Sequence, residues 1–274
     1  MKNILVAIDF SKGSLQAFKY AVKLAQKSNA DLTIVWVDNQ VVQNSLYTPP
    51  VNDVRSEAKK RIEAIIKKQR GKIKEHIKYK LRKGKVHQEV ETVAKAIQAD
   101  LVVAGTHGGS GYEKLWIGSN AYRIVIHAPC PVITVRFDAS INLGISRLVM
   151  PVDSSLDTLH KLEVTATMAK LFKAEVHVLA LLEDKLKSMR MKAESHGRQA
   201  VKFFTENGID SVYSSMDTDN ATETIINYTS NVGGNLISIM TEQNATGTNA
   251  LLGPNARLIV NQSSIPVLCS KPLK

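Results

Sequence analysis

The stretch that decides the fold reads Leu101-Val-Val-Ala-Gly-Thr-His-Gly108. Its apolar residues form a short run that ends in glycine, which is typical of a buried strand followed by a tight turn. Nine residues after Gly108 the chain continues with Gly118-Ser119-Asn120, and a helical pattern then extends to His127. Strand, turn and helix in this order indicate a parallel α/β sheet, with the turn at the carboxyl end of its strand.

The second half of the chain repeats this region in altered form. Aligned without gaps, residues 236–267 reproduce residues 101–132, with glycine, asparagine and proline at matching positions. Three positions of the glycine-rich region differ between the copies: Gly105 becomes Met240, Gly108 becomes Gln243 and Ser119 becomes Pro254. A repeat of this length in a chain of 274 residues predicts two tandem domains, at 1–138 and 139–274.

Apolar runs alternate with helical patterns along both halves. Strands are expected at 4–8, 32–37, 77–82, 101–104 and 131–136 in the first half, and at 148–152, 175–181, 236–240 and 265–269 in the second. The helical patterns cover 15–25, 54–73, 89–99, 120–127, 159–172 and 188–206. This alternation predicts two doubly wound α/β domains, each with a mostly parallel five-stranded sheet that helices cover on both faces.

Positive charge is concentrated in the first half. The formal net charge is +11, and residues 1–138 contain 23 Lys and Arg against 12 Asp and Glu, whereas residues 139–274 contain 13 of each. Much of the excess lies between Lys59 and Lys85. Two interpretations stay open. One is a basic surface for nucleic acid or an acidic protein, and the other is a solvated helix face beside a sheet edge that lysines protect from pairing.

The glycine-rich region suits a phosphate group. Glycine at 105 and 108 lets the backbone turn sharply and approach oxygen atoms closely. Gly118-Ser119-Asn120 opens a helix, whose free N–H groups and positive dipole end favour an anion. The alternative is a glycine-rich surface loop followed by an ordinary helix N-cap. The sequence contains neither a Walker GxxxxGK[ST] run nor a GxGxxG run after the first strand, which disfavours P-loop hydrolysis and dinucleotide-dependent hydride transfer.

The spacing of the glycines carries a resemblance to a known family. Gly105, Gly108, Gly118 and Ser119 complete the pattern G-2x-G-9x-G-[ST], the strand-terminal Asp9 precedes it, and His127-Ala-Pro-Cys-Pro-Val132 follows it. In these features the chain resembles the universal stress protein family. The resemblance implies that ATP or AMP binds with adenine and ribose near the ends of the first two strands and phosphates on the glycine-rich region. The residues implied are Ile8, Asp9, Val37, Gly105, His107, Gly108, Gly118, Ser119 and Asn120.

Further properties follow from the resemblance. It implies Mg²⁺ or Mn²⁺ held through the phosphates, domains paired through their last strands, and a homodimer with four domains. We expect nucleotide occupancy to act as a stress-response switch with little turnover, because no catalytic set can be assigned and His107 lacks an assignable partner. Slow ATP hydrolysis or autophosphorylation stays open. The rival hypothesis is a scaffold protein that uses the basic 59–85 surface.

The altered repeat predicts different roles for the two halves. Met240, Gln243 and Pro254 add side chains or remove an N–H donor, so the second half is expected to bind nucleotide poorly and to act as a pairing and regulatory partner. No apolar run approaches the roughly 20 residues that span a bilayer, and the first residues do not resemble a signal peptide. The expected location is the cytoplasm, away from membranes.

Overall fold

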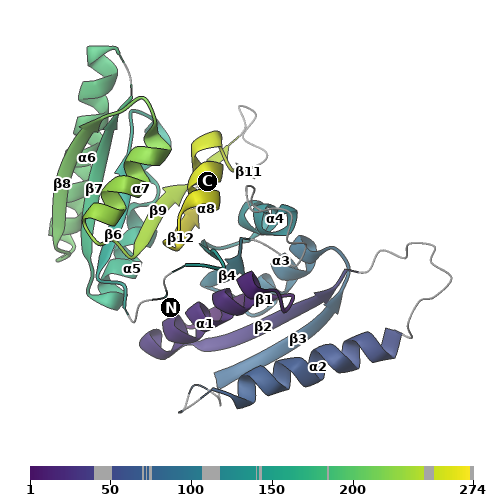
Figure 1. Cartoon of the computed structure of the whole chain (residues 1–274). Coiled ribbons are helices and arrows are strands. Elements are labelled where there is room, and N and C mark those ends of the chain that lie inside the picture. Colours follow the sequence, from purple (N-terminus) through teal and green to yellow (C-terminus); the bar gives the residue numbers. More distant parts are fainter. Residues whose placement is uncertain are drawn as a thin grey trace.

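Strands and helices alternate in both halves of the chain (Figure 1). The structure, a computed structural model of the whole chain, describes residues 1–39, 51–69, 71, 73, 76–106, 118–139, 141, 144–183, 185–243 and 250–271. The first half contains β1 (Asn3–Ile8), α1 (Lys12–Ser28), β2 (Asp31–Asp38), α2 (Val51–Lys67), β3 (Ile77–Lys83), α3 (Val86–Ala96), β4 (Leu101–Gly105), α4 (Ser119–His127) and β5 (Val132–Val135). The second half contains β6 (Arg147–Val152), the 3₁₀ helix η2 (Leu156–Leu159), α5 (Leu162–Phe172), β7 (Glu175–Leu182), α6 (Lys187–Glu206), β8 (Ser211–Asp217), α7 (Ala221–Asn231), β9 (Leu236–Met240), β10 (Glu242–Gln243), β11 (Ala250–Leu251), α8 (Pro254–Gln262) and β12 (Val267–Ser270).

One ten-stranded sheet runs through the molecule, in the order β3-β2-β1-β4-β5-β12-β9-β6-β7-β8. Each half supplies five neighbouring strands that run parallel to one another, as predicted. β5 and β12 join the halves in antiparallel register, with Ile133 opposite Leu268. The two predicted sheets are therefore the halves of a single sheet, joined through the last strand of each half.

Helices cover both faces of this sheet. On one face α1, α2, α5 and α6 pack over a hydrophobic cluster that includes Phe18, Ile62 and Phe204. On the other face α3, α4, α7 and α8 pack over a second cluster, which includes Ile124 and Ile259. Each cluster contains residues of both halves, so the apolar core continues across the β5–β12 junction.

Five elements of the second half are missing from the list of expected strands and helices: β8, α7, α8 and the two-residue strands β10 and β11. β8 and α7 show why. β8 reads Ser-Val-Tyr-Ser-Ser-Met-Asp, and none of its residues is buried because it is an edge strand. α7 is rich in Thr, Ile and Asn, which have modest helix propensity. Neither segment has the strong apolar periodicity from which strands and helices are recognised, and contacts within the fold determine both.

Several helix boundaries also differ from the prediction. α3 begins at Val86 rather than at 89. Its N-cap is Lys85, and the preceding residue, Gly84, has a positive φ of 140°. α2 ends at Lys67, before the left-handed Gly71 with its φ of 74°. In the second half, the helix expected at 159–172 begins only at Leu162 as α5, and the 3₁₀ helix η2 precedes it. The shift at Val86 matters for the site, because this residue lines the pocket described next.

Candidate functional site

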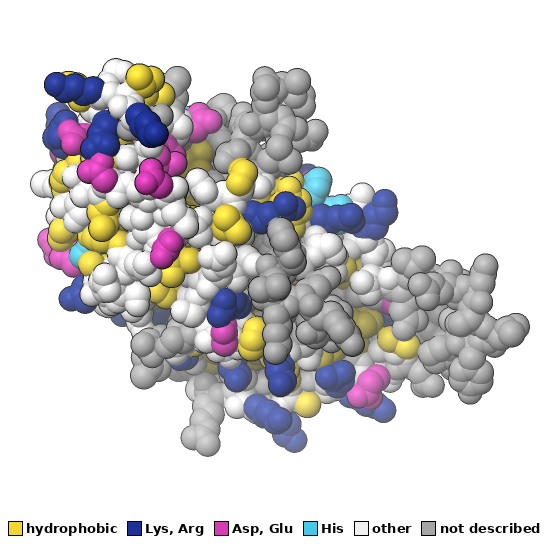
Figure 2. Space-filling view, turned by 45° about the horizontal axis from the view of Figure 1, so that its top comes forward, with side chains coloured by type: hydrophobic (Ala, Val, Ile, Leu, Met, Phe, Trp, Pro, Cys, Tyr) yellow, Lys and Arg dark blue, Asp and Glu magenta, His cyan; other side chains and the backbone are white. Residues whose placement is uncertain are grey.

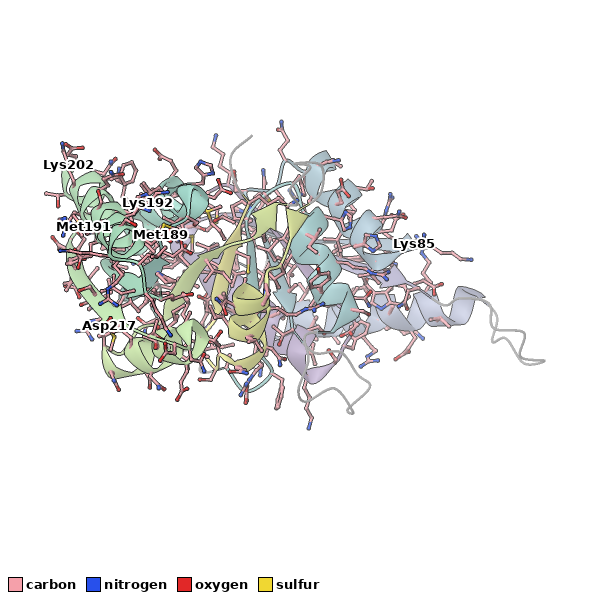
Figure 3. The ribbon with its side chains drawn as sticks, turned by 90° about the horizontal axis from the view of Figure 1, so that it is seen from above. Lys85, Met189, Met191, Lys192, Lys202 and Asp217 are labelled. Atoms are coloured by element: carbon pink, nitrogen blue, oxygen red, sulfur yellow. The ribbon has the colours of Figure 1, made fainter. Side chains whose placement is uncertain are left out.

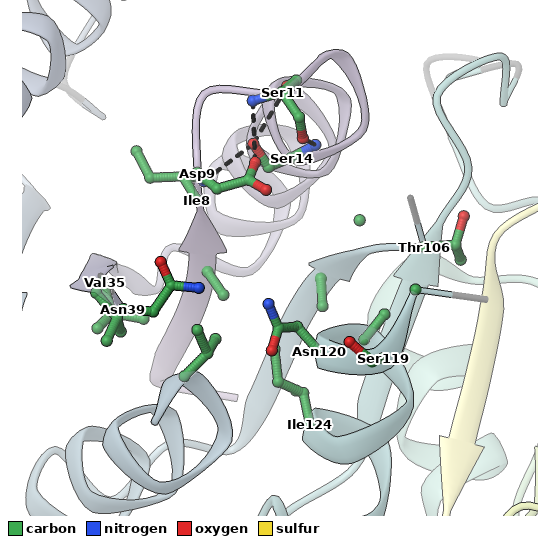
Figure 4. Close-up of a pocket in the computed structure, with 17 residues that line it drawn as sticks. Ile8, Asp9, Ser11, Ser14, Val35, Asn39, Thr106, Ser119, Asn120 and Ile124 are labelled. Carbon is green, nitrogen blue, oxygen red and sulfur yellow. Dashed lines mark hydrogen bonds between the residues drawn. The ribbon is translucent and has the colours of Figure 1, made fainter. Parts of the chain in front are cut away.

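A pocket of about 310 Å³ opens where β1, β2 and β4 end, beside the first turns of α1 and α4 (Figure 4). Seven of the nine predicted binding residues line it: Ile8, Asp9, Val37, Gly105, Gly118, Ser119 and Asn120. The other two, His107 and Gly108, lie outside the described residues. The topology explains why these segments meet, since β1 lies between β2 and β4 and parallel strands end at the same edge of a sheet.

The turn after β1 fixes Asp9 at the pocket (Figure 4). The N–H of Ser11 donates to Asp9 Oδ1 at 2.9 Å, and the N–H of Asp9 donates to Ser14 Oγ at 3.2 Å. Ser11 is also the N-cap of α1, because its hydroxyl oxygen accepts from the N–H of Ser14 at 3.2 Å. Phe10, which lies between Asp9 and Ser11, has a left-handed backbone with φ of 64°. The N–H of Ser11 therefore orients the Asp9 carboxylate, while Ser14 Oγ holds the Asp9 backbone against the start of α1.

Gly105 is needed for a reason that the sequence alone did not indicate. A Cβ atom at this position would lie 2.6 Å from the carbonyl carbon of Gly13 and 2.8 Å from the amide nitrogen of Ser14. Such distances are too short for a real side chain, so the glycine lets the end of β4 pack directly against the first turn of α1. The described contact is internal to the protein, whereas the prediction attributed this glycine to the approach of a phosphate.

The N-terminus of α4 forms the opposite wall of the pocket. Its N-cap is Gly118, which has no side chain to accept a hydrogen bond from the first turn. The N–H of Gly118 itself donates to the carbonyl oxygen of Thr106 at 2.8 Å, which ties α4 to the end of β4. The N–H groups of the first helical residues, Ser119 and Asn120, have no acceptor within a regular helix. Together with the helix dipole, they favour an anion at this wall.

An apolar wall faces these polar groups. It consists of Val35 and Val37 from β2, Val86 from α3 and Ile124 from α4, and Asn39 lies at its rim. The sequence analysis missed Val86 because the predicted helix began after it. Asn39 could have been found, since it follows the predicted strand at 32–37 and so lies at the same edge of the sheet as Asp9. This apolar wall, one carboxylate and an uncapped helix N-terminus can accommodate a planar base, a sugar and phosphates, respectively.

An equivalent pocket of about 330 Å³ lies in the second half. Its strand-to-helix turn repeats the first: the N–H of Ser155 donates to Asp153 Oδ1 at 2.8 Å, and the N–H of Asp153 donates to Thr158 Oγ1 at 3.2 Å. Leu181 and Asn255 line this pocket where Val37 and Asn120 line the first. The frame of the pocket is therefore present in both halves.

The floor of the second pocket contains a buried amine. Lys161 lines the pocket, is 4% exposed, and corresponds to Ala17 of the first half. Its Nζ donates to the carbonyl oxygen of Thr158 at 2.7 Å. Burial lowers the pKa of Lys161 to about 8, although the charge of Asp153 opposes the shift. Among the described lining residues of the first pocket, none is a lysine or an arginine. Sequence-based prediction did not identify Lys161.

The altered repeat positions have structural consequences. Met240 replaces Gly105, so the close backbone contact that Gly105 makes with Gly13 is not open to the second half, and a 3₁₀ helix precedes α5 there. Pro254 is the first residue of α8, a position where proline is favoured because its missing N–H would be unpaired in any case. Pro254 therefore suits the helix while removing a donor from the pocket. Gln243 belongs to β10, and its side chain lies outside the described part.

Both halves of the chain match the same family model. It describes the universal stress protein family and matches residues 1–136 and 144–271. The chain belongs to the universal stress protein family. The resemblance stated from the glycine spacing is thereby confirmed, as is the doubly wound α/β fold.

Relatives of this universal stress protein include YxiE of Bacillus subtilis, which is 30% identical over 144 residues, covering 48% of this chain and 97% of YxiE. Universal stress protein A homolog 1 of Coxiella burnetii is 33% identical over 141 residues, covering 49% and 95%. A solved universal stress protein of Archaeoglobus fulgidus matches over 98% of both chains with a TM-score of 0.74 at 17% identity, which shows a shared fold. Another A. fulgidus universal stress protein is solved in complex with dAMP; it covers 46% of this chain and 96% of that one, at 19% identity and a TM-score of 0.38.

The described part of this universal stress protein contains neither a cluster of metal-binding side chains nor a helix suited to cross a membrane. No three or more His, Cys, Asp or Glu side chains gather there in a way that could hold a metal ion. A divalent ion bound through nucleotide phosphates needs no such protein cluster, since Mg²⁺ keeps several waters and uses substrate oxygens. None of the described helices combines the length and the apolar character of a membrane span.

Proposed function

We propose that this universal stress protein binds an adenine nucleotide, ATP or AMP, in the first-half pocket and that occupancy acts as a stress-response switch. The observation that carries the proposal is that seven of the nine residues implied by the family resemblance line one pocket of about 310 Å³. One family member, from A. fulgidus, is solved in complex with dAMP, so nucleotide binding occurs in the family.

The lining suggests where each part of the nucleotide lies. The base fits the apolar wall of Val35, Val37 and Ile124. A ribose hydroxyl group suits the Asp9 carboxylate, whose Oδ1 accepts from the N–H of Ser11. The phosphates suit the uncapped start of α4 at Ser119 and Asn120, where charge-assisted hydrogen bonds are short and strong. Gly105, His107 and Gly108 belong to the proposed phosphate side, and Mg²⁺ or Mn²⁺ would bind through the phosphates.

Little turnover is expected from this pocket. The hydroxyl group of Ser14, the nearest serine to Asp9 along α1, donates to the carbonyl oxygen of Ser11 at 3.2 Å and accepts from the N–H of Asp9. Ser11 caps α1. The described lining contains no histidine that could form the hydroxyl–imidazole pair of an activated nucleophile. A binding switch needs no such pair, and slow hydrolysis or autophosphorylation would be a secondary activity.

The remaining parts of the proposal concern the whole chain. The domain boundary at 138/139, the cytoplasmic location and a homodimer of four domains belong to it. The second half would serve as the pairing and regulatory partner, because its pocket has a buried lysine in the floor and a proline at the start of α8.

The basic 59–85 surface fits a solvated face better than a binding site for nucleic acid. β3 is an edge strand, and its exposed lysines alternate with its partly buried residues. Several of the charges have protein partners: Lys78 pairs with Asp31 at 2.8 Å, and Arg82 Nε pairs with Glu89 at 2.8 Å. Partnered charges on an edge strand discourage strand pairing and leave less potential for a polyanion.

Calorimetry on the intact protein tests the proposed function. ATP and AMP are titrated with and without Mg²⁺ into the wild type, Gly118→Val and the matched second-half variant Gly253→Val. Both glycines are helix N-caps with φ of −57°, which valine can adopt, so the substitution adds a side chain without backbone strain. We expect one site per chain, lost in Gly118→Val and retained in Gly253→Val. Two sites, or binding that survives Gly118→Val, would contradict the proposal.

A further inference from the structure

A second cavity adjoins the nucleotide pocket of the first half. It measures about 360 Å³ and shares Asn39, Val86 and Asn120 with that pocket as lining residues. Asn120 is the one phosphate-side residue that the two described linings share, since Gly105, Gly118 and Ser119 line only the nucleotide pocket. The two spaces therefore meet along one wall, and the cavity lies on the side away from the end of β4.

Positive charge dominates this cavity. Lys83, Lys85 and Arg123 line it, together with His87, and Asp38 is the one acidic residue in its lining. No described residue lies within ion-pair distance of these two lysines or of Arg123. The nearby acids have other partners, since Glu89 pairs with Arg82 at 2.8 Å and Glu91 with Lys95 at 2.7 Å.

The histidines beside the cavity show the same excess of charge. His87 and His127 stack with ring centroids 4.8 Å apart. Burial lowers the pKa of His87, and the charges of His127, Arg123 and Lys85 lower it further. Figure 2 shows histidine side chains next to Lys and Arg side chains on one face of the molecule. An anion in the cavity would relieve the repulsion among these groups.

The second half provides an internal control. The strand registers place Asp217 at the position of Lys83, and Asn220 is the N-cap of α7 as Lys85 is of α3 (Asp217 and Lys85 are labelled in Figure 3). The ungapped repeat alignment places Leu258 at the position of Arg123. Asn220 caps α7, because its side chain accepts from the N–H of Glu223 at 3.2 Å. Lys85, the N-cap of α3, provides no such acceptor. The cations thus occur only beside the pocket that has the complete glycine pattern.

We propose that this cavity binds a second phosphate group of the nucleotide in the neighbouring pocket, one attached at the sugar and separate from the phosphates at the start of α4. The favoured ligand class is then a nucleoside bisphosphate rather than a nucleotide with a single phosphate chain. This inference rests on the proposed function. It follows from the position of the cavity, which adjoins the pocket through Asn39, Val86 and Asn120 but is not lined by Gly105, Gly118 or Ser119.

Three nucleotides and two variants test the inference by calorimetry on the full chain at fixed ionic strength. AMP has one phosphate, ADP has two in one chain, and adenosine 3′,5′-bisphosphate has two on separate carbons. The double variant Lys85→Asn/Arg123→Leu introduces the residues of the second half. Lys80→Ser is the control: it removes an exposed lysine of β3 that lines neither cavity, and the corresponding residue of β8 is Ser214.

We expect the wild type to bind the bisphosphate about 10-fold or more tightly than AMP, the gain from one charge-assisted hydrogen bond. The double variant should lose that gain while its affinity for AMP stays within about twofold, and Lys80→Ser should behave as the wild type. If the double variant does not fold, as judged by thermal unfolding, Lys85→Gln alone provides the same comparison.

Each other outcome overturns the inference. A bisphosphate that binds no better than AMP, an equal loss for AMP and bisphosphate, or a selective loss for ADP would each exclude a separate phosphate in this cavity. If AMP binds but the bisphosphate shows no preference, only this inference fails. If no nucleotide binds the wild type, the proposed function fails together with it.

Discussion

The two pockets of this chain share a frame and differ in the groups that line it. Asp9 and Asp153 end equivalent strands, and each holds the following turn through the same pair of hydrogen bonds. Around this common frame, the first pocket has an uncapped α4 and a neighbouring cationic cavity, whereas the second has a buried Lys161. The comparison teaches that the bonds that build the strand-to-helix turn can persist in both copies while the pocket surface diverges.

The largest effect is expected from giving the first pocket the methionine of the second. In Gly105→Met, the Cβ atom would meet the backbone of Gly13 at 2.6 Å, so α1 or β4 must move. We expect an unfolding free energy lower by about 3 kcal/mol or more, as for severe overpacking, and loss of measurable nucleotide binding. Urea unfolding and calorimetry measure the two. Gly144→Met is the control, since a Cβ there meets nothing within 4 Å; comparable losses in both variants would refute the explanation.

Lys161 sets the next largest effect, which depends on pH. Burial lowers the pKa of Lys161 to about 8 from 10.5, so below pH 8 the folded state contains a buried charge at a cost of roughly 3 kcal/mol. Between pH 8 and 10.5 the folded state loses this proton while the unfolded state keeps it, so stability should rise with pH over that window. Lys161→Met should be more stable than the wild type at pH 7, by an amount of that order.

Chemical unfolding at pH 7 and pH 10 checks this second prediction. The stability difference between Lys161→Met and the wild type should shrink at pH 10. Lys187→Met, which replaces an exposed lysine at the start of α6, should leave stability nearly unchanged at both pH values. A loss of stability in Lys161→Met at pH 7 would mean that the Nζ bonds to Thr158 outweigh the cost of burial.

A smaller effect separates binding from folding at the start of α4. Ser119→Pro introduces the residue found at the first position of α8, where proline fits a helix. Stability should stay within about 0.5 kcal/mol, as for a substitution compatible with the local backbone. Nucleotide affinity should fall about 10-fold, because an N–H and a hydroxyl group are lost from the proposed phosphate side. Calorimetry and thermal unfolding measure both; unchanged affinity would remove Ser119 from the proposed site.

The smallest effect concerns the start of β1. Asp100 Oδ2 accepts from the N–H of Asn3 at 2.9 Å and from that of Lys2, as Asn235 Oδ1 accepts from Ser146 and Arg147 in the second half. Burial raises the pKa of Asp100, but these N–H groups and the nearby positive charge together lower it by more, so the net shift is downward. Asp100→Asn should therefore cost less than about 1 kcal/mol at pH 7, since the group is exposed.

The sign of this last effect follows from the lowered pKa. The stabilisation by the carboxylate is present above the unfolded pKa of about 3.9 and is lost as the pH falls through the folded pKa. The difference in stability between the wild type and Asp100→Asn should therefore decrease as the pH falls below about 3.9 and vanish below the folded pKa. A difference that persists there would indicate a contribution from packing rather than from charge.

Much of the fold could be predicted because its signals are local. Short apolar runs ending at Asp9 and Gly105 mark strands whose polar ends meet at the same edge of the sheet, and the run ending at Asp153 marks the equivalent strand of the antiparallel half. The glycine spacing also led to residues that line the first pocket. β8 could not be predicted, because an exposed edge strand needs no apolar pattern. The buried Lys161 was also missed, since one lysine in a helical pattern has no signal that separates a pocket floor from a solvated surface.

The antiparallel contact between β5 and β12 has a consequence for assembly. Thr134 Oγ1 donates to the carbonyl oxygen of Val267, and Arg136 donates to that of Gln262 at 2.8 Å, so the last strands of the two halves are occupied by one another. Pairing is then an intramolecular event, whose effective concentration the short connection between the halves fixes. Dilution to the lowest cellular abundance would leave this association intact, whereas a pair of separate chains would come apart. The open edges of the sheet are β3 and β8, and an additional strand could only be added there.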